Sequence, residues 1–415
     1  MARKILIHTI AFSPDGVSTA YLYNDIALKF KEEGYKVVVL TTTPQYNLLQ
    51  SELKKQPLKR KSLFYYESIF HGITVKHIPQ KKFRSSILRI IGFVYWHIVA
   101  FFIGISEKNT DVILSPSPPL TIGYVNILIG KIKKAKVIYN VQEIYPDLLI
   151  KEKGLNPSSF IIRILKRLER FVYNKSDAVT TIDEVFANTI VDRFKDKSKL
   201  KIIPNFVDTE IYKPTPVNNL EINKIDFPKT DALKLMYAGN IGYAQDWEPL
   251  IQLAIRLQNE NIEFFVIGEG AMKEWVEKEI VKHKLNKVHL LPYQPRNLMP
   301  SLIAYSDIQF IFMTPKTEGD GFPSKVYTIM ACERPLLVCS GLNTPIINFL
   351  ENKDCAYLVT EKDTDKKLND LVNILLSTDK NTLREMGKNG LDIIHTKYSK
   401  TIVTQQYVDL VNSLL

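Results

Sequence analysis

The segment GDGFPSKVYTIMACERP, residues 319–335, combines residue types that bind anions. Its Gly, Pro and Ser predict a turn, after which Lys325 opens an apolar helix with the sequence VYTIMA. The first N–H groups of a helix have no partner within it, and the helix dipole favours negative charge there. That dipole disfavours a lysine unless an anion is bound. We therefore expect Lys325 and Ser324 to bind a phosphate-bearing ligand, with a solvated surface lysine as the alternative.

Two further glycine-containing turns follow predicted strands in the same half of the chain. YAGNIGYAQD contains Gly239, Asn240 and Gly242, and FFVIGEG contains Glu269 between two glycines. Glycines spaced two apart are a weak signal alone, and their position directly after a strand strengthens it. We expect the first turn to contact the same ligand and the second to border a nucleobase.

The N-terminal half offers two candidate positions. In FSPDGVSTAY, Asp15 and Gly16 predict a tight turn that lets backbone amides approach a phosphate or sugar, with an ordinary helix-capping Asp15 as the alternative. In NVQEIYPD, Glu143 follows a buried strand. We expect its carboxylate to face a cleft between two domains, and the alternative is a helix-capping or hinge carboxylate.

The elements that must position these residues alternate between strand and helix. β-branched apolar runs predict strands at 4–12, 35–43, 73–79, 111–117, 136–142, 176–182 and 199–207. The pattern restarts at LKLMYAGNIG and continues through EFFVIGEG, VHLLPY, IQFIFM and RPLLVCS. Such alternation is typical of parallel βαβ units, whose ligands lie at the carboxyl ends of the strands. The sequence thus predicts an α/β protein with two Rossmann-like, doubly wound domains.

We place an N-terminal domain at residues 1–208, a linker at 209–230 and a second domain at 231–395. A C-terminal helix at 396–415 could pack against either half. The N-terminus lacks a signal peptide's long apolar run and cleavage site. The three cysteines cannot pair fully and show no metal-ligand spacing with histidine, so we expect a reduced, cytoplasmic protein without a metal site.

The net charge of +11 is concentrated in one stretch. Residues 51–90 contain ten Lys or Arg and two acids, an excess of eight positive charges that indicates nucleic acid or an anionic membrane. The apolar, aromatic segment 89–105 follows, and its roughly 16 residues fall short of the roughly 20 that span a bilayer. It is either a buried core helix or an interfacial helix anchored by KKFR and Trp96. An apolar helix beside basic residues favours the membrane, and no base-stacking motif for nucleic acid lies nearby.

Together these motifs resemble a known enzyme family. FSPDG, SPSPPL, NVQEIYPD, IIPNFVDTEIYKP, YAGNIGYAQD, VIGEG and PSKVYTIMACERP are similar, in order, to motifs of the GT-B glycosyltransferases of retaining family 4. The branch they resemble contains the bacterial O-antigen and capsule N-acetylfucosaminyl transferases. The resemblance covers nearly the whole chain.

The resemblance implies roles for individual residues. Asp320 occupies the position of a carboxylate that contacts the donor sugar, and Thr328 stands where the family carries a second acid that contacts the ribose. Asn240 and Gln245 replace an Arg and a Lys of many relatives, so Lys325, with Arg296, would bind the diphosphate. Glu143 falls where relatives carry an Asp or His beside the reacting sugar. The implied catalytic residues are therefore Glu143, Asp320 and Lys325.

The resemblance also implies the reaction. It predicts transfer of an N-acetylated (6-deoxy)hexosamine such as L-FucNAc from a UDP-sugar to a sugar on undecaprenyl diphosphate, with retention and without a metal or cofactor. The protein would be peripheral on the inner face of the cell membrane, would contact its anionic surface and would not bind nucleic acid. Two alternatives remain. One is a UDP-sugar 2-epimerase with the same architecture. The other is a non-catalytic partner in a glycan-assembly complex, which is suggested by Thr328 in place of the acid.

Overall fold

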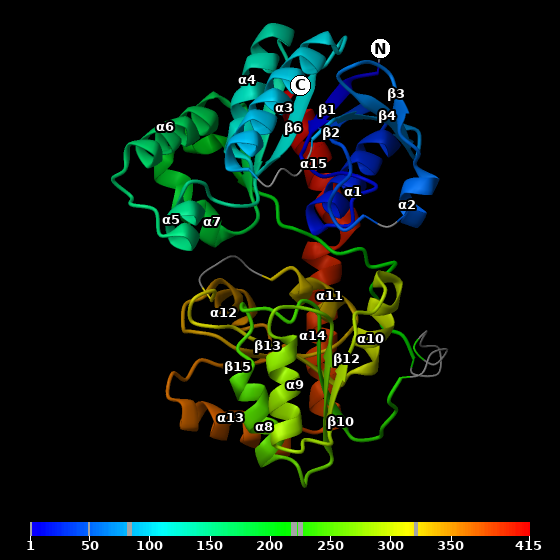
Figure 1. The fold of residues 1–415 in the computed structure, drawn as a ribbon, viewed down its shortest axis with the longest axis vertical. Coiled ribbons are helices and arrows are strands. Elements are labelled where there is room, and N and C mark those ends of the chain that lie inside the picture. Colours follow the sequence, from blue (N-terminus) through cyan, green and yellow to red (C-terminus); the bar gives the residue numbers. More distant parts are fainter. Residues whose placement is uncertain (1, 49, 81–84, 217–221, 223–226, 319–322) are drawn as a thin grey trace. The chain divides into compact units, whose positions relative to one another are not determined.

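The computed structural model describes residues 2–48, 50–80, 85–216, 222, 227–318 and 323–415. The chain forms two compact units (Figure 1). The N-terminal unit consists of Met1–Asn205 with Thr401–Leu415, and the C-terminal unit is Phe206–Lys400. Helix α15, Lys400–Leu414, therefore belongs almost entirely to the N-terminal unit.

The N-terminal unit is built on a sheet of nine strands in the order β3-β4-β5-β2-β1-β6-β7-β8-β9. The strands are β1 (Lys4–His8), β2 (Lys36–Thr42), β3 (Lys59–Arg60), β4 (Tyr66–Phe70), β5 (Ile73–Ile78), β6 (Val112–Ser117), β7 (Lys136–Val141), β8 (Ala178–Thr181) and β9 (Leu200–Ile202). β1 pairs in parallel with β2 and β6, with Ile5 opposite Val37 and Val112. Only β4, in its pairs with β3 and β5, is antiparallel to its neighbours in this sheet as described.

Helices cover both faces of this sheet. They are α1 (Ser18–Glu32), α2 (Gln50–Lys55), α3 (Ser86–Ser106), α4 (Leu120–Lys133), α5 (Asp147–Lys153), α6 (Phe160–Lys175), α7 (Glu184–Ile190) and α15. α3, α4 and α6 share one apolar core with alternate residues of the central strands, among them Leu6 and Tyr139. α1 lies against the other face, where the Tyr23 hydroxyl donates to Asn140 Oδ1 over 3.0 Å. Strands buried on both faces explain the continuous apolar runs of the sequence.

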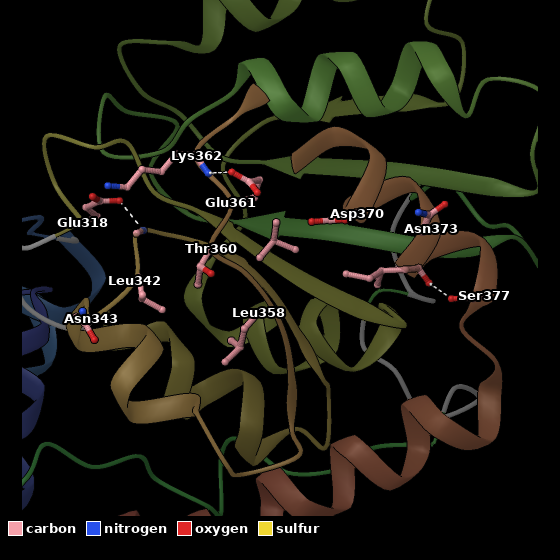
Figure 2. Close-up of a pocket in the computed structure, with 13 residues that line it drawn as sticks. Glu318, Leu342, Asn343, Leu358, Thr360, Glu361, Lys362, Asp370, Asn373 and Ser377 are labelled. Carbon is pink, nitrogen blue, oxygen red and sulfur yellow. Dashed lines mark hydrogen bonds between the residues drawn. The ribbon is translucent and has the colours of Figure 1, made fainter. Parts of the chain in front are cut away.

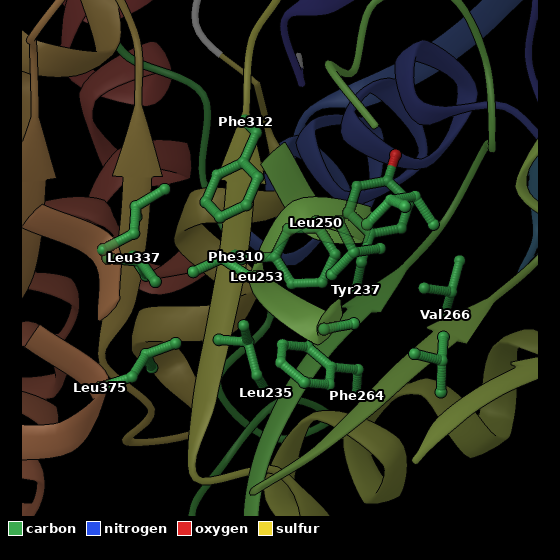
Figure 3. Close-up of a cluster of buried hydrophobic side chains, with 14 of the residues drawn as sticks. Leu235, Tyr237, Leu250, Leu253, Phe264, Val266, Phe310, Phe312, Leu337 and Leu375 are labelled. Carbon is green, nitrogen blue, oxygen red and sulfur yellow. The ribbon is translucent and has the colours of Figure 1, made fainter. Parts of the chain in front are cut away.

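The C-terminal unit has a six-stranded, all-parallel sheet in the order β12-β11-β10-β13-β14-β15. Its strands are β10 (Leu233–Ala238), β11 (Ile262–Ile267), β12 (Val288–Leu291), β13 (Ile308–Phe312), β14 (Leu336–Cys339) and β15 (Ala356–Val359). The helices are α8 (Glu248–Arg256), α9 (Lys273–Lys282), α10 (Met299–Tyr305), α11 (Lys325–Ala331), α12 (Pro345–Leu350), α13 (Thr364–Ser377) and α14 (Lys380–Ile393). Figure 3 shows Tyr237, Phe264 and Phe310 packed with leucines of α8 and α13 in the core of this unit.

The length expected for the apolar helix after the basic stretch is wrong. α3 spans 21 residues, not about 16, and by length and composition Ile87–Ser106 is long enough to cross a membrane. One side of α3 is nevertheless buried in the core, through Trp96, Val99, Ala100 and Ile103. Its other side is exposed, so α3 is neither a fully buried core helix nor one free on all sides. The predicted anchor KKFR, residues 81–84, lies outside the described residues.

Candidate functional site

Lys325 begins α11, and its ammonium group lies at the carboxyl end of β10. Lys325 Nζ is 3.8 Å from the centroid of the Tyr237 ring. A Cβ atom added to Gly239 would come within 3.0 Å of the same nitrogen. The chain thus brings the predicted anion-binding lysine to the first glycine of the turn after β10, although 86 positions of sequence separate them. These two sequence-predicted site residues form one site.

The ammonium of Lys325 is held in an environment that disfavours its charge. The side chain as a whole is partly exposed, but protein atoms surround the ammonium, and this burial lowers the pKa of Lys325 to about 7. Among the described residues, no carboxylate forms an ion pair with it. The Tyr237 ring stabilises the cation only partly, since such contacts contribute about 0.5–2 kcal/mol. An anionic ligand would restore the charge that burial destabilises.

This environment predicts that UDP binding depends on pH. A bound diphosphate raises the pKa of Lys325, so above pH 7 binding must be accompanied by proton uptake, and affinity falls by up to about tenfold per pH unit. Below pH 7 the lysine is already charged and its contribution is constant. Calorimetric titration of UDP between pH 7 and 9 measures this slope, because the terminal phosphate, with a pKa of about 6, is ionised throughout. A Lys325→Arg variant should lose the slope, and flat wild-type affinity up to pH 9 would contradict the assignment.

The turns after β10 and β11 pack backbone against backbone. Gly268 has φ +147°, and a Cβ added to it would lie 1.9 Å from the carbonyl oxygen of Gly239. The Gly239 N–H donates to Ile267 O and the Ile241 N–H donates to Glu269 O, each over 2.9 Å. Glycine at 268 is therefore required by the position of the turn that carries Gly239. The second turn supports the first, independently of any contact with a nucleobase.

We expect Gly268→Ala to displace the Gly239 turn and destabilise the C-terminal unit by roughly 2–4 kcal/mol, with weaker UDP binding. Gly154→Ala is the matched control, because Gly154 also has positive φ, +59°, yet nothing lies within 4 Å of its added Cβ. Backbone strain alone costs about 1–2 kcal/mol there. Thermal unfolding and UDP titration report both quantities. Equal effects of the two substitutions would show that the contact with Gly239 is unimportant.

The rest of the turn after β10 is fixed by hydrogen bonds to β10, to β13 and to the residue that precedes α8. The Tyr237 hydroxyl donates to Asn240 O over 2.7 Å, and Trp247 Nε1 donates to Gly242 O over 3.0 Å. Gln245 is buried, and its Oε1 accepts the Phe312 N–H over 3.1 Å. Gln245, where the resemblance expects a cation, therefore joins the turn to β13. The Asn240 side chain is exposed.

The residues around Lys325 are only partly described. Ser324 is exposed and directly precedes α11, and its side chain makes no capping hydrogen bond. Thr328 is half-buried, and its hydroxyl donates to Lys325 O over 2.8 Å. Its remaining lone pairs could still accept from a ribose hydroxyl. Asp320 lies outside the described residues, so its predicted contact with the donor sugar stays a prediction.

Glu269 and Arg296 lie on the turns after two neighbouring parallel strands, β11 and β12, at the edge of the sheet where Gly239 lies. Both side chains are exposed. Glu269 forms an ion pair with Lys273 over 2.6 Å, and that contact lowers the pKa of its carboxyl group. Arg296 begins a short 3-10 helix at Arg296–Leu298. Their contacts with a base or diphosphate stay predictions.

In the N-terminal unit, Asp15 and Gly16 hold a neighbouring loop. Asp15 is buried, and its Oδ1 accepts the N–H groups of Gln45 and Tyr46 over 2.7 and 2.8 Å. A Cβ added to Gly16 would lie 2.6 Å from Asn47 O. The residue that precedes α1 as its cap is Val17, so Asp15 does not cap the helix. Asp15 thus anchors the loop after β2, and its contact with a ligand stays a prediction.

Glu143 follows β7, and its backbone is held at the end of β6. The Ser117 hydroxyl donates to Glu143 O over 2.9 Å and accepts the Gln142 N–H over 3.1 Å. The Gln142 side chain exchanges two hydrogen bonds of 3.0 Å with Asn205. Glu143 itself is half-buried. This two-sided support fixes the backbone from which its carboxylate projects, as a positioned catalytic group requires.

The sequence analysis did not identify Tyr237 and Ser117, although they lie within YAGNIG and SPSPPL, two of the motifs from which the site was predicted. It also missed a hollow of about 870 Å³ beside the carboxyl ends of β14 and β15 (Figure 2). None of its described lining residues was predicted for the site. Glu318 lies on its wall and accepts the Gly341 N–H over 2.6 Å, which ties the segment before α11 to the end of β14.

Comparisons with known proteins cover both units. The family model described as Glycosyltransferase Family 4 matches residues 20–211, and the model described as Glycosyl transferases group 1 matches residues 218–392. WcaI of Escherichia coli, whose name assigns it to colanic acid biosynthesis, is 23% identical over 338 residues, 79% of this chain and 81% of its own. The glycosyltransferase WbjE of Pseudomonas aeruginosa is 23% identical over 313 residues, 74% of this chain and 76% of its own.

Solved structures agree with the predicted fold. HepE of Anabaena in complex with UDP matches with a TM-score of 0.71 at 15% identity, over 99% of this chain and 100% of its own. WaaG, a glycosyltransferase involved in lipopolysaccharide biosynthesis, matches with a TM-score of 0.66 at 14% identity, over 98% of this chain and 99% of its own. The prediction of the GT-B fold with two Rossmann-like domains is confirmed. The two halves of the chain thus match, in order, two glycosyltransferase family models, and the chain is a glycosyltransferase with the GT-B fold.

Proposed function

We propose that this glycosyltransferase moves an N-acetylated (6-deoxy)hexosamine such as L-FucNAc from a UDP-sugar to a lipid-linked sugar in surface polysaccharide synthesis. The observation that carries the proposal is the ammonium of Lys325, buried at the end of β10 beside Gly239. A cation in this position suits a nucleoside diphosphate. HepE has been solved with UDP and with UDP-glucose, and WcaI is named for colanic acid biosynthesis, which supports a UDP-sugar donor and a capsule or O-antigen product.

In the proposed reaction the leaving group is UDP, so the bond to the sugar breaks as charge develops on the diphosphate. Lys325 stabilises that charge, and backbone amides of the Gly239 turn add donors that need no reorganisation. Retention without a metal ion then requires no strong protein base, because the leaving phosphate can accept the proton of the acceptor hydroxyl. Glu143 orients the acceptor or stabilises the cationic sugar, and Asp320 contacts the donor sugar.

An acceptor carried on undecaprenyl diphosphate requires the enzyme to work at the membrane. The exposed side of α3 supports a location at the membrane, since Ile90, Ile91, Val94, Ile98 and Phe102 are each about half exposed or more, at 63, 57, 49, 51 and 60%. Contiguous exposed apolar side chains of this kind mark interaction surfaces on soluble proteins. The excess of positive charge in residues 51–90 matches an anionic lipid surface.

Replacing Ile91 and Ile98 by Ser should weaken binding to vesicles of phosphatidylglycerol and phosphatidylcholine by roughly tenfold or more, because each loses apolar area from the lipid interface. Vesicle flotation measures the bound fraction. Val281→Ser on α9 is the control, since Val281 is 72% exposed but belongs to the C-terminal unit. Unchanged flotation of the α3 variant would contradict the membrane location.

UDP release from candidate UDP-sugars, with and without the bacterial lipid fraction, tests the proposed activity. The transferase hypothesis requires release that depends on the lipid fraction. Interconversion of the sugar without lipid would identify a UDP-sugar 2-epimerase. A protein that binds no uridine nucleotide would be the non-catalytic partner of a glycan-assembly complex.

A further inference from the structure

Helix α6 of the N-terminal unit exposes a stripe of large apolar side chains. Phe160, Ile161, Ile164 and Phe171 are 68, 66, 44 and 37% exposed. On the opposite side of the helix, Ile162, Val172 and Tyr173 are buried in the core. The core therefore does not account for the exposed stripe, which lies on the solvent side of a helix that is already packed.

A row of basic side chains borders this stripe. Arg163, Arg167 and Arg170 are exposed and Lys166 is half-buried. Within the part of the chain that the structure describes, none of the four forms an ion pair. The single acid of α6, Glu169, is buried and pairs with Arg193. The exposed surface of α6 thus carries positive charge that the described residues leave uncompensated.

The stripe continues onto the neighbouring helix α4. The ring of Phe171 lies 5.7 Å from that of Tyr124 on α4, and Tyr124 is itself exposed. α4 packs between α3 and α6 in the core that all three share, so their outward sides face away from the same face of the sheet. The exposed residues of α6 and those of α3 accordingly belong to one layer of the N-terminal unit.

We propose that α6 is a second lipid-contacting helix, so that the N-terminal unit rests on an anionic bilayer along α3, α4 and α6 together. The charge of α6 favours a lipid bilayer as the partner of this surface, because an apolar stripe flanked by Arg and Lys without ion pairs matches the acyl boundary and the anionic headgroups of one leaflet. This inference rests on the proposed membrane location and sharpens it. Contact along two helices on either side of α4 fixes how the unit is rotated on the membrane, whereas α3 alone leaves rotation about its own axis free.

Site-specific labelling tests the contact directly. The native thiols of Cys332, Cys339 and Cys355 are buried and burial raises the pKa of each, so a surface cysteine can be labelled selectively. We expect a polarity-sensitive fluorophore on an Ile161→Cys variant to shift to the blue when the full-length protein meets vesicles containing phosphatidylglycerol. The same fluorophore on Val281→Cys should not shift. Absence of a shift at position 161 overturns the proposal. So does a shift that occurs without vesicles and grows with protein concentration, which would identify a second copy of the chain as the occupant.

A second set of variants separates this inference from the membrane location itself. We expect Ile161→Ser with Ile164→Ser, and separately Arg163→Ser with Arg167→Ser, each to weaken flotation by roughly tenfold, while the arginine pair affects anionic vesicles only. If the α3 variant is released from vesicles but both α6 variants bind as the wild type does, the role of α6 is refuted and the membrane location stands. If the α3 variant and both α6 variants all bind vesicles as the wild type does, the lipid contact of α6 and the membrane location are both refuted.

Discussion

Lys325→Met is expected to weaken UDP binding by about 30- to 1,000-fold, the equivalent of roughly 2–4 kcal/mol for losing one partner of a desolvated charge pair. Methionine preserves most of the apolar stem and its packing on the Tyr237 ring, from which Lys325 Nζ is 3.8 Å away. Because the ammonium is already buried and has no ion pair with a described carboxylate, its removal should not destabilise the unit. Isothermal titration measures the affinity, and thermal unfolding verifies the fold.

Lys353→Met is the matched control for this variant. Lys353 also lies over an aromatic ring, with its Nζ 4.7 Å from the centroid of Phe349, and it belongs to the same unit. It follows α12 rather than the end of β10, so its loss should leave the Kd for UDP unchanged. Retained affinity in Lys325→Met, or an equal loss in both variants, would refute the assignment of Lys325 to the diphosphate.

Glu143→Gln should reduce turnover by about 100- to 10,000-fold, the range typical of removing a charged or acid–base catalytic group. The substitution keeps the shape of the side chain, and Ser117 continues to hold the backbone at this position. In the proposed mechanism the substitution removes the negative charge beside the cationic sugar, while Lys325 on the other unit is untouched. The Kd for UDP should therefore stay within about twofold of the wild-type value, and initial-rate assays of UDP release should show the effect in kcat.

Glu184→Gln serves as the control for loss of a carboxylate in the same unit, since Glu184 is exposed in the first turn of α7. It should be as active as the wild type. A Glu143→Gln variant with near-normal kcat would exclude a catalytic role for Glu143. A variant that loses UDP affinity as well would show that the substitution disturbs more than the charge.

The sequence predicts the central parallel strands well because they are apolar, β-branched runs that helices bury on both faces, whereas the strand expected at 199–207 is only the partly exposed β9 at 200–202. The prediction from the sequence fails for strands that lack a continuous apolar, β-branched run. The β3–β4 hairpin lies in KRKSLFYYESIF, whose charged residues conceal its alternation, and β15 consists of the four residues AYLV. α3 is longer than expected because it begins three residues before the apolar segment 89–105, at Ser86, and ends one residue after it, at Ser106.

The sequence could predict those residues of the candidate site that are recognisable from their place at the end of a strand or the start of a helix. Lys325 could be identified from its place at the start of a helix. The contact of Lys325 with Tyr237 could not be predicted from the sequence, because it arises from the neighbouring positions of β10 and β13 in the sheet. The support that Gly268 gives to Gly239 is likewise a contact between turns of adjacent strands. The hydrogen bonds by which Asp15 anchors the loop after β2 could not be predicted either, because Gln45 and Tyr46 lie 30 or more positions away in the sequence.

Transfer of sugar into lipid tests the central claim most directly. The wild-type protein, mixed with a UDP-sugar labelled in its sugar and with vesicles carrying the undecaprenyl-diphosphate-linked acceptor, should move the label into the organic phase and release one UDP per sugar transferred. Lys325→Met and Glu143→Gln should both fail under the same conditions. Label that remains in the aqueous phase with every acceptor, or that appears there as an epimerised UDP-sugar, would contradict the account.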